Sequence, residues 1–141
     1  MLSSLERRID EIQRLLTYLI DEAANGIPIL VEGLNDKLCL EEIGVKGKFL
    51  FAKTSGKSIL DVLKEVETCN KEVILLLDFD KRGREMTYRL IENLQSYHIK
   101  ANIIFWKNIS SIVGREVKDI EGLSTYIQTL KRKLEKHKAK Y

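Results

Sequence analysis

The sequence predicts an α/β protein in which a four-stranded parallel sheet lies between helices on both of its faces. Short apolar runs alternate with amphipathic stretches through the middle of the chain, which is typical of parallel strands joined by helical crossovers. The run Val73–Leu77 is apolar at every position, as expected of a strand that is covered on both faces. A length of 141 residues fits one compact domain with a single core.

An amphipathic helix is expected at each end of the chain. The first carries apolar residues three or four positions apart until Asn25 and Gly26 end it, namely Leu5, Ile9, Ile12, Leu16, Leu19 and Ala23. The second has the same spacing at Leu123, Ile127, Leu130 and Leu134. Each apolar stripe either packs against the core, which we favour, or forms the seam of a homodimer. The expected organisation is an N-terminal helix over 1–26, the α/β domain over 27–112 and a basic C-terminal helix over 113–141 that packs on it.

The central elements are expected to alternate between strand and helix. Strands are predicted at Ile27–Val31, Lys48–Ala52, Val73–Leu77 and Ala101–Trp106, with helices at Asp36–Ile43, at Lys57–Val66 and from Gly83 to about Tyr97. In open parallel sheets, ligands bind beyond the carboxyl ends of the strands. We therefore look for functional residues immediately after the predicted strands.

Composition and charge indicate where the protein is located and which partners it could bind. The chain has 44% hydrophobic and 32% charged residues, and no apolar stretch approaches the length of a membrane span, so it is expected to be cytoplasmic and not to enter a membrane. The net charge is +3, but residues 131–141 alone carry +5, which leaves −2 for the rest. This basic end either attracts a polyanion such as nucleic acid or is a solvated helix end whose cations favour the helix dipole. Both interpretations stay open.

Three carboxylates follow two of the predicted strands. Glu32 comes directly after the first strand, and Asp78 and Asp80 come directly after the third. Because alternate strand residues point the same way, the two aspartates are expected to share a direction. Clustered carboxylates need a compensating cation, and Mg²⁺ binds to one or two carboxylates together with phosphate oxygens. A local alternative is that Asp78 leads into the next helix and Asp80 caps it near Gly83.

These residues resemble the Toprim family. Residues 31–36, Val-Glu-Gly-Leu-Asn-Asp, are similar to its E-G-x-x-D motif, and residues 78–83, Asp-Phe-Asp-Lys-Arg-Gly, are similar to its D-x-D-x-x-G motif. Residues 54–56, Thr-Ser-Gly, resemble the short turn of the family after the second strand. The resemblance covers roughly Ile27 to Trp106. It implies a Rossmann-like Toprim fold of the kind found in topoisomerases, bacterial-type primases, OLD-family nucleases and ribosomal-RNA-maturing ribonucleases, here in a small stand-alone form.

The resemblance also implies roles for individual residues. Glu32 would be the general acid or base of phosphoryl transfer and a further metal ligand, and Asp78 and Asp80 would bind Mg²⁺, or Mn²⁺ in its place. Gly33, Asp36 and Gly83 would support the site. Basic residues expected at the same edge would bind nucleic-acid phosphates, namely Lys53, Lys57, Lys81, Arg82 and Arg84.

Two further segments leave alternatives open. The acids of Lys118-Asp119-Ile120-Glu121-Gly122 either complete a second metal site or mark the start of a helix, which we favour. Trp106 either stacks on a base or, as we favour, packs in the core.

The leading functional hypothesis is Mg²⁺-dependent phosphoryl transfer on nucleic acid, most plausibly phosphodiester cleavage by a nuclease. A second hypothesis is a non-catalytic module that binds nucleic acid, DNA or RNA, or joins a larger nucleic-acid-processing complex. Primase-like nucleotidyl transfer is a weaker third, because the chain is short for holding both nucleotides and template.

Overall fold

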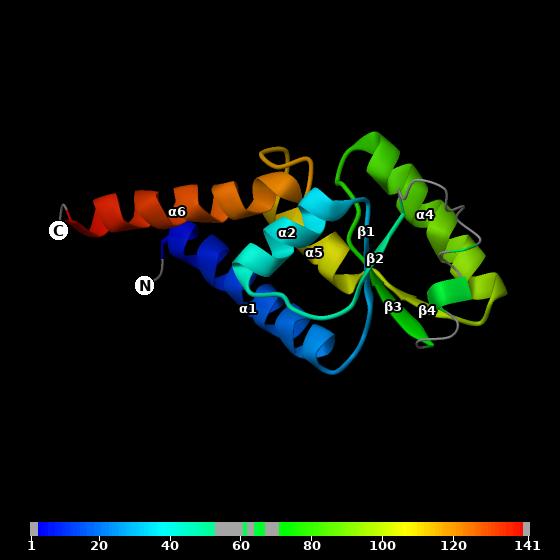
Figure 1. The fold of residues 1–141 in the computed structure, drawn as a ribbon. Helices are drawn as coiled ribbons and strands as arrows, with labels where there is room; N and C mark the ends of the chain where they lie inside the picture. Colours follow the sequence, from blue (N-terminus) through cyan, green and yellow to red (C-terminus); the bar gives the residue numbers. More distant parts are fainter. Residues whose placement is uncertain (1–2, 53–60, 62–63, 67–70, 140–141) are drawn as a thin grey trace.

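The computed structural model describes residues 3–52, 61, 64–66 and 71–139. In this part of the chain four strands form one parallel sheet in the order β2-β1-β3-β4 (Figure 1). The strands are β1 (Ile29–Val31), β2 (Phe49–Phe51), β3 (Glu72–Leu75) and β4 (Lys100–Asn102). Within the sheet Leu30 is paired with Leu50 on one side and with Leu75 on the other. The predicted α/β class with a four-stranded parallel sheet is confirmed.

Helices cover both faces of this sheet. The described helices are α1 (Ser4–Ala24), α2 (Leu34–Ile43), α4 (Lys81–Ser96), α5 (Ile104–Val113) and α6 (Glu121–Ala139). Residues of α1, α2, α5 and α6 pack in one buried cluster with Ile74 and Leu76, whereas Leu90 and Leu94 of α4 pack in a second cluster with Leu75. Successive residues of the β3 segment thus face opposite helical layers, which explains why the run Val73–Leu77 is apolar throughout.

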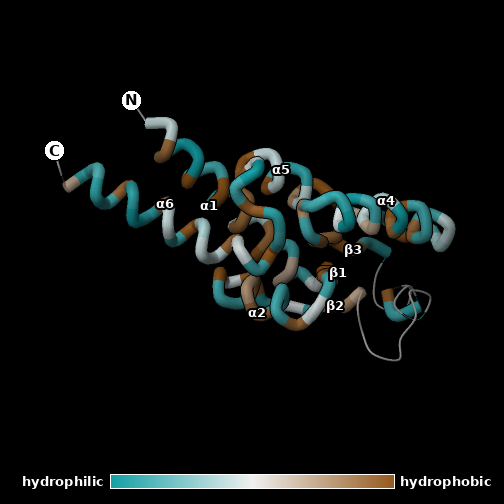
Figure 2. The backbone as a smooth tube through the Cα atoms, turned by 90° about the horizontal axis from the view of Figure 1, so that it is seen from above, coloured by the Kyte–Doolittle hydropathy of each residue, from teal (hydrophilic) through white to brown (hydrophobic). Residues whose placement is uncertain are grey.

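The two terminal helices pack against each other and extend to the same side of the molecule, away from the strands (Figure 1). The side chain of Ser3 caps α1 by accepting a hydrogen bond from the backbone N–H of Glu6 (3.1 Å), and α1 ends before Asn25, as expected. Their apolar stripes are largely buried in the first cluster, whereas the last turns of α6 carry mostly hydrophilic residues (Figure 2). A seam between two copies of the chain remains a prediction.

The predicted strand Ala101–Trp106 is wrong in its second half. Strand β4 ends at Asn102, and the apolar residues that follow begin helix α5. The Asn102 side chain accepts a hydrogen bond from the backbone N–H of Ile104 (3.0 Å) and so turns the chain out of the sheet. The buried residues of α5 have helical spacing, namely Phe105, Trp106, Ile109 and Val113. The run 103–106 is apolar at every position, so the sequence there looks equally like a buried strand.

The crossover between β2 and β3 lies mostly outside the described residues. Of the helix expected at Lys57–Val66, Asp61 and residues 64–66 are described and are helical, and Val66 is buried in the second cluster. The other boundaries differ from the predicted ones by a few residues; α2, for example, begins at Leu34 rather than at Asp36. None of the helices in the described part of the chain combines the length and the apolar character needed to cross a membrane.

Candidate carboxylate site

Adjacent parallel strands bring Glu32 and Asp78 together. Glu32 follows β1 directly, and β1 lies beside β3. The backbone N–H of Leu76 donates to the carbonyl oxygen of Leu30 (2.9 Å), so the two segments stay paired as they approach the acids. Both carboxylates form ion pairs with Arg82, at 3.0 Å for Glu32 and 3.7 Å for Asp78. The predicted convergence of these two acids at the carboxyl edge of the sheet is therefore present.

The two acids line a shallow depression of about 240 Å³. Its lining consists of Glu32, Gly33, Leu34, Asn35, Asp36, Asp78 and Glu121. Four carboxylates from three separate segments thus surround one small space that is open to solvent. Such an arrangement concentrates negative charge and suits a cationic ligand.

Asp36 lines this depression and also holds the neighbouring loop in place. Its Oδ2 accepts a hydrogen bond from the backbone N–H of Gly33 (3.0 Å), which fixes the first turn of α2. Burial raises the pKa of Asp36, as do the nearby charges of Glu121 and Glu32. These contacts fit the supporting role that the motif implied, because the carboxylate organises the loop that carries Glu32.

Asp78 is the most perturbed acid of the site. Burial raises the pKa of Asp78 to about 7, and the neighbouring Glu32 adds to this through a hydrogen bond and through its charge. The backbone N–H of Ile120, which donates to Oδ1 at 3.4 Å, lowers the pKa and so opposes the rise. A carboxyl group that ionises with difficulty beside another carboxylate indicates a local excess of negative charge. A bound cation would relieve this excess.

Asp80 and Gly83 form the start of α4. The Oδ1 atom of Asp80 accepts a hydrogen bond from the backbone N–H of Gly83 (2.7 Å), so Asp80 is the N-cap, as the local alternative expected. A side chain at position 83 would have its Cβ 2.1 Å from the carbonyl oxygen of Asp78, and only glycine fits there. Asp80 is not among the residues that line the depression, and its role as a metal ligand remains a prediction.

Glu121 joins the site from the far end of the chain. The segment before α6 is held against the acids by hydrogen bonds from Phe79 N–H to the Lys118 carbonyl oxygen (2.7 Å) and from the Cys39 thiol to the Ile120 carbonyl oxygen (3.0 Å). This places Glu121 in the lining of the depression, whereas Asp119 caps the following turn through Gly122 N–H (2.7 Å). Asp119 and Glu121 could be singled out from the sequence, but their distance along the chain from Glu32 gave no sign that Glu121 would lie beside it.

The predicted phosphate-binding residues have different surroundings. Arg82 is bound to the acids, whereas Lys81 and Arg84 are exposed in the first turn of α4. Lys53 and Lys57 lie outside the described residues, as does the Thr54–Gly56 turn. The role of all five in binding phosphate remains a prediction.

Trp106 is a core residue beneath the site. It is buried, and its indole N–H donates to the carbonyl oxygen of Leu77 (3.0 Å). The ring of Tyr88 meets it edge to face, with centroids 6.1 Å apart. The favoured interpretation of Trp106 as a core residue is confirmed, and its hydrogen bond supports the backbone next to Asp78.

The donor set fits a hard divalent cation that keeps most of its ligands as water or substrate. Within the described part of the chain, no three His, Cys, Asp or Glu side chains are gathered closely enough to hold a metal by themselves. Glu32 and Asp78 nevertheless present carboxylate oxygens beside an open depression. Mg²⁺ typically takes one or two protein carboxylates and fills its other positions with water and phosphate oxygens. Glu32 and Asp78 are therefore the residues that would hold such an ion.

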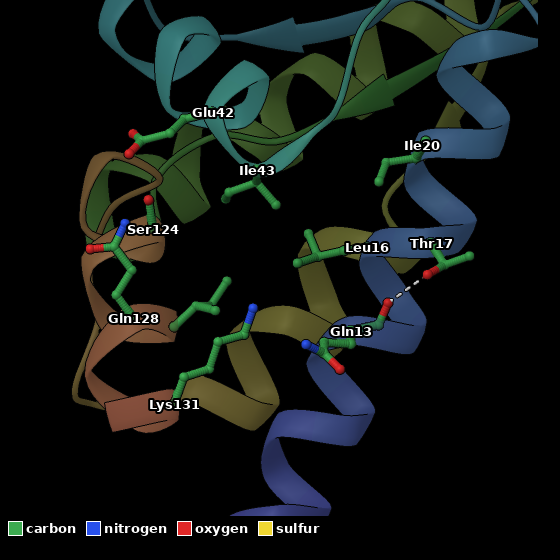
Figure 3. Close-up of a pocket in the computed structure, with 10 residues that line it drawn as sticks. Gln13, Leu16, Thr17, Ile20, Glu42, Ile43, Ser124, Gln128 and Lys131 are labelled. Carbon is green, nitrogen blue, oxygen red and sulfur yellow. Dashed lines mark hydrogen bonds between the residues drawn. The ribbon is translucent and has the colours of Figure 1, made fainter. Parts of the chain in front are cut away.

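A larger hollow of about 410 Å³ lies elsewhere, between α1, α2 and α6 (Figure 3). Apolar side chains such as Leu16, Ile20 and Ile43 share its lining with Glu42 and Lys131. It has a single acid and a single cation, and the carboxylates described above are not part of its lining. We therefore place the candidate site at the smaller, acidic depression.

The fold and the site together define a class of protein. The parallel sheet has the order β2-β1-β3-β4, with a glutamate after β1 and a D-x-D segment after β3. This is consistent with the Toprim fold that the two motifs implied. The model of the Toprim-like family matches residues 29–120. The chain belongs to the Toprim-like family.

Similar proteins occur in archaea. A UPF0292 protein of Methanosarcina barkeri is 31% identical over 127 residues, which cover 90% of this chain and 87% of that protein. A UPF0292 protein of Methanocaldococcus jannaschii is 40% identical over 124 residues, which cover 85% of this chain and 95% of that protein. Among solved structures, a protein from Aquifex aeolicus aligns with a TM-score of 0.64 and 28% identity, covering 77% of this chain and 94% of that one.

Proposed function

We propose that this protein cleaves phosphodiester bonds of nucleic acid with the help of Mg²⁺. The observation that carries the proposal is the meeting of Glu32 and Asp78 at the ends of adjacent parallel strands, beside an acidic depression that is open to solvent. Membership of the Toprim-like family supports the same chemistry. Attack by water on a phosphodiester bond is a reaction that a cation held by carboxylates can promote.

Each residue has a part that follows from its position. Asp78 and Glu32 would hold the cation, which would neutralise charge that develops on the phosphate. Glu32 would also move the proton of the attacking water or of the leaving oxygen. Asp36 keeps the Glu32 loop in place through Gly33 N–H. The exposed cations Lys81 and Arg84 would hold phosphates next to the cleaved bond.

The test is cleavage of labelled single- and double-stranded DNA and RNA with Mg²⁺, Mn²⁺ or a chelator. Wild-type protein should cleave at least one of these substrates with a divalent cation and none with chelator. Glu32→Gln and Asp78→Asn should each lower the rate by at least about 100-fold, because each removes a charge needed at the transition state.

Glu92→Gln provides a matched control, because Glu92 is an exposed acid on α4 outside the lining of the depression. It should cleave like the wild type. Equal, cation-independent cleavage by all four proteins would show that the carboxylates do not carry the reaction.

A second candidate is a module that binds nucleic acid without cleaving it. The observation in its favour is the row of exposed basic residues on the last turns of α6. This alternative predicts binding that weakens steeply with salt, with no cleavage under any of the conditions above.

A further inference from the structure

Arg82 already occupies the space between the two carboxylates that would hold a cation. Its Nη2 lies 3.0 and 3.2 Å from the two oxygens of Glu32 and 3.7 Å from Oδ2 of Asp78. One positively charged nitrogen thus approaches three carboxylate oxygens that come from the ends of two strands. Such a position is that of a counter-ion shared by both acids.

The surroundings of Arg82 allow it to leave. Its side chain is 52% exposed, whereas those of Glu32 and Asp78 are 9% and 14% exposed. The acids are fixed by the sheet and by the loop before α6, but Arg82 stands on the first turn of α4 and reaches the acids through its long, flexible side chain. Because the guanidinium is half exposed, solvent screens its attraction to the two acids, and a divalent cation with twice the charge can compete with it.

We propose that Arg82 is a resident counter-ion of the carboxylate site, which a divalent cation displaces and which then becomes available to a phosphate of the nucleic acid. The proposal rests on the proposed function in its choice of cation and of phosphate partner. It explains how one side chain can serve both states: the guanidinium neutralises the acids before the cation arrives, and its planar fork suits a phosphate afterwards.

The first measurement is the affinity for Mn²⁺ alone, by calorimetric titration of chelator-treated full-length protein. Arg82→Gln should bind Mn²⁺ about three- to tenfold more tightly than the wild type, because the competing cation has been removed. Arg89→Gln removes the same charge from the same helix, at an exposed position that does not line the acidic depression. It should stay within about twofold of the wild type, since a non-contacting charge acts only through screened solvent.

The second measurement is the affinity for a labelled oligonucleotide with and without Mn²⁺. Wild-type affinity should rise when Mn²⁺ is added, and Arg82→Gln should lose at least half of that rise. Arg82→Lys is a second variant in case Arg82→Gln does not fold, because lysine keeps the positive charge but lacks the planar guanidinium group. It should bind Mn²⁺ with an affinity between those of the wild type and Arg82→Gln.

The outcomes separate this inference from the proposed function. If the wild type binds Mn²⁺ in a manner that Glu32→Gln abolishes, but Arg82→Gln binds no more tightly, the counter-ion role is overturned while the metal site stands. If Glu32→Gln binds Mn²⁺ as tightly as the wild type does, or if neither protein binds it, the metal site and the counter-ion role both fail. Tighter binding by Arg82→Gln but not by Arg89→Gln supports the exchange.

Discussion

At the scale of single residues, Asp78 makes the stability of the protein depend on pH. The carboxyl group ionises near pH 3.8 when the chain is unfolded and near pH 7 in the folded protein, chiefly because it is buried. The folded state therefore favours the protonated form. The protonated Asp78 carboxyl group therefore stabilises the folded state fully below about pH 4, and this contribution is lost as pH rises to about 7.

This leads to a prediction for the protein without bound cations. Between pH 4 and pH 7 the wild type should lose on the order of 2 kcal/mol of unfolding free energy relative to Asp78→Asn. The full pKa difference corresponds to about 4 kcal/mol, and we expect about half of it because the site is open to solvent. Urea unfolding of both proteins across this range, in chelator, measures the difference. Parallel pH curves would contradict the assignment.

At the scale of elements, the first turn of α4 is packed directly against the backbone of the loop that precedes it. Gly83 touches the Asp78 carbonyl oxygen so closely that no side chain fits between them. The same turn carries Asp80 as its cap and Arg82 as the partner of Glu32. The glycine therefore sets the distance between the helix and the acid site.

Gly83→Ala should destabilise the fold by about 2 kcal/mol, because the clash outweighs the better helix propensity of alanine. Gly33→Ala is the matched control, since Gly33 is also in an acid motif but has open space where a Cβ would lie. Its cost should stay below about 1 kcal/mol. Urea unfolding compares the two, and equal losses would show that close packing is not what requires Gly83.

At the scale of the whole molecule, α6 connects the acid site to the basic end of the chain. Glu121 lies at the depression, and the basic residues that begin at Lys131 lie ten or more positions further along the helix. With a rise of 1.5 Å per residue, Lys131 and Lys138 are about 15 and 25 Å from Glu121 along its axis. A bound duplex that reached both places would extend over about four to seven base pairs.

If this end of α6 binds nucleic acid, neutralising it should weaken binding without altering the acid site. The triple variant Lys133→Gln, Lys136→Gln and Lys138→Gln should lower the slope of log affinity against log salt by up to about 3. Filter binding or anisotropy at several salt concentrations measures the slope. Unchanged binding would favour the interpretation of a solvated helix end.

The control for this experiment lies at the other edge of the sheet. Lys46→Gln, Lys48→Gln and Lys100→Gln together remove the same charge from exposed positions at or before the amino ends of β2 and β4. This variant should keep the wild-type slope if the basic end of α6 is a specific contact. A similar loss in both variants would point to net charge alone.

Much of the molecule could be predicted from local pattern. The parallel sheet follows from apolar runs that alternate with helical stripes, and the pairing of Glu32 with Asp78 follows from parallel strands that end at one edge. Helix α5 could not be recognised, because the apolar run from Ile103 to Trp106 suits a strand and a helix equally until its burial is known.

The sequence by itself determined the class of fold and two of the acids at the candidate site, because periodicity and strand direction are local properties of the chain. Only the tertiary structure decided that Glu121 joins them, that Asp80 serves as a helix cap and that Arg82 is bound between Glu32 and Asp78. These are contacts between segments far apart in the chain, or choices between partners that a side chain could reach equally well. Packing selects among them, and no spacing in the sequence records that selection.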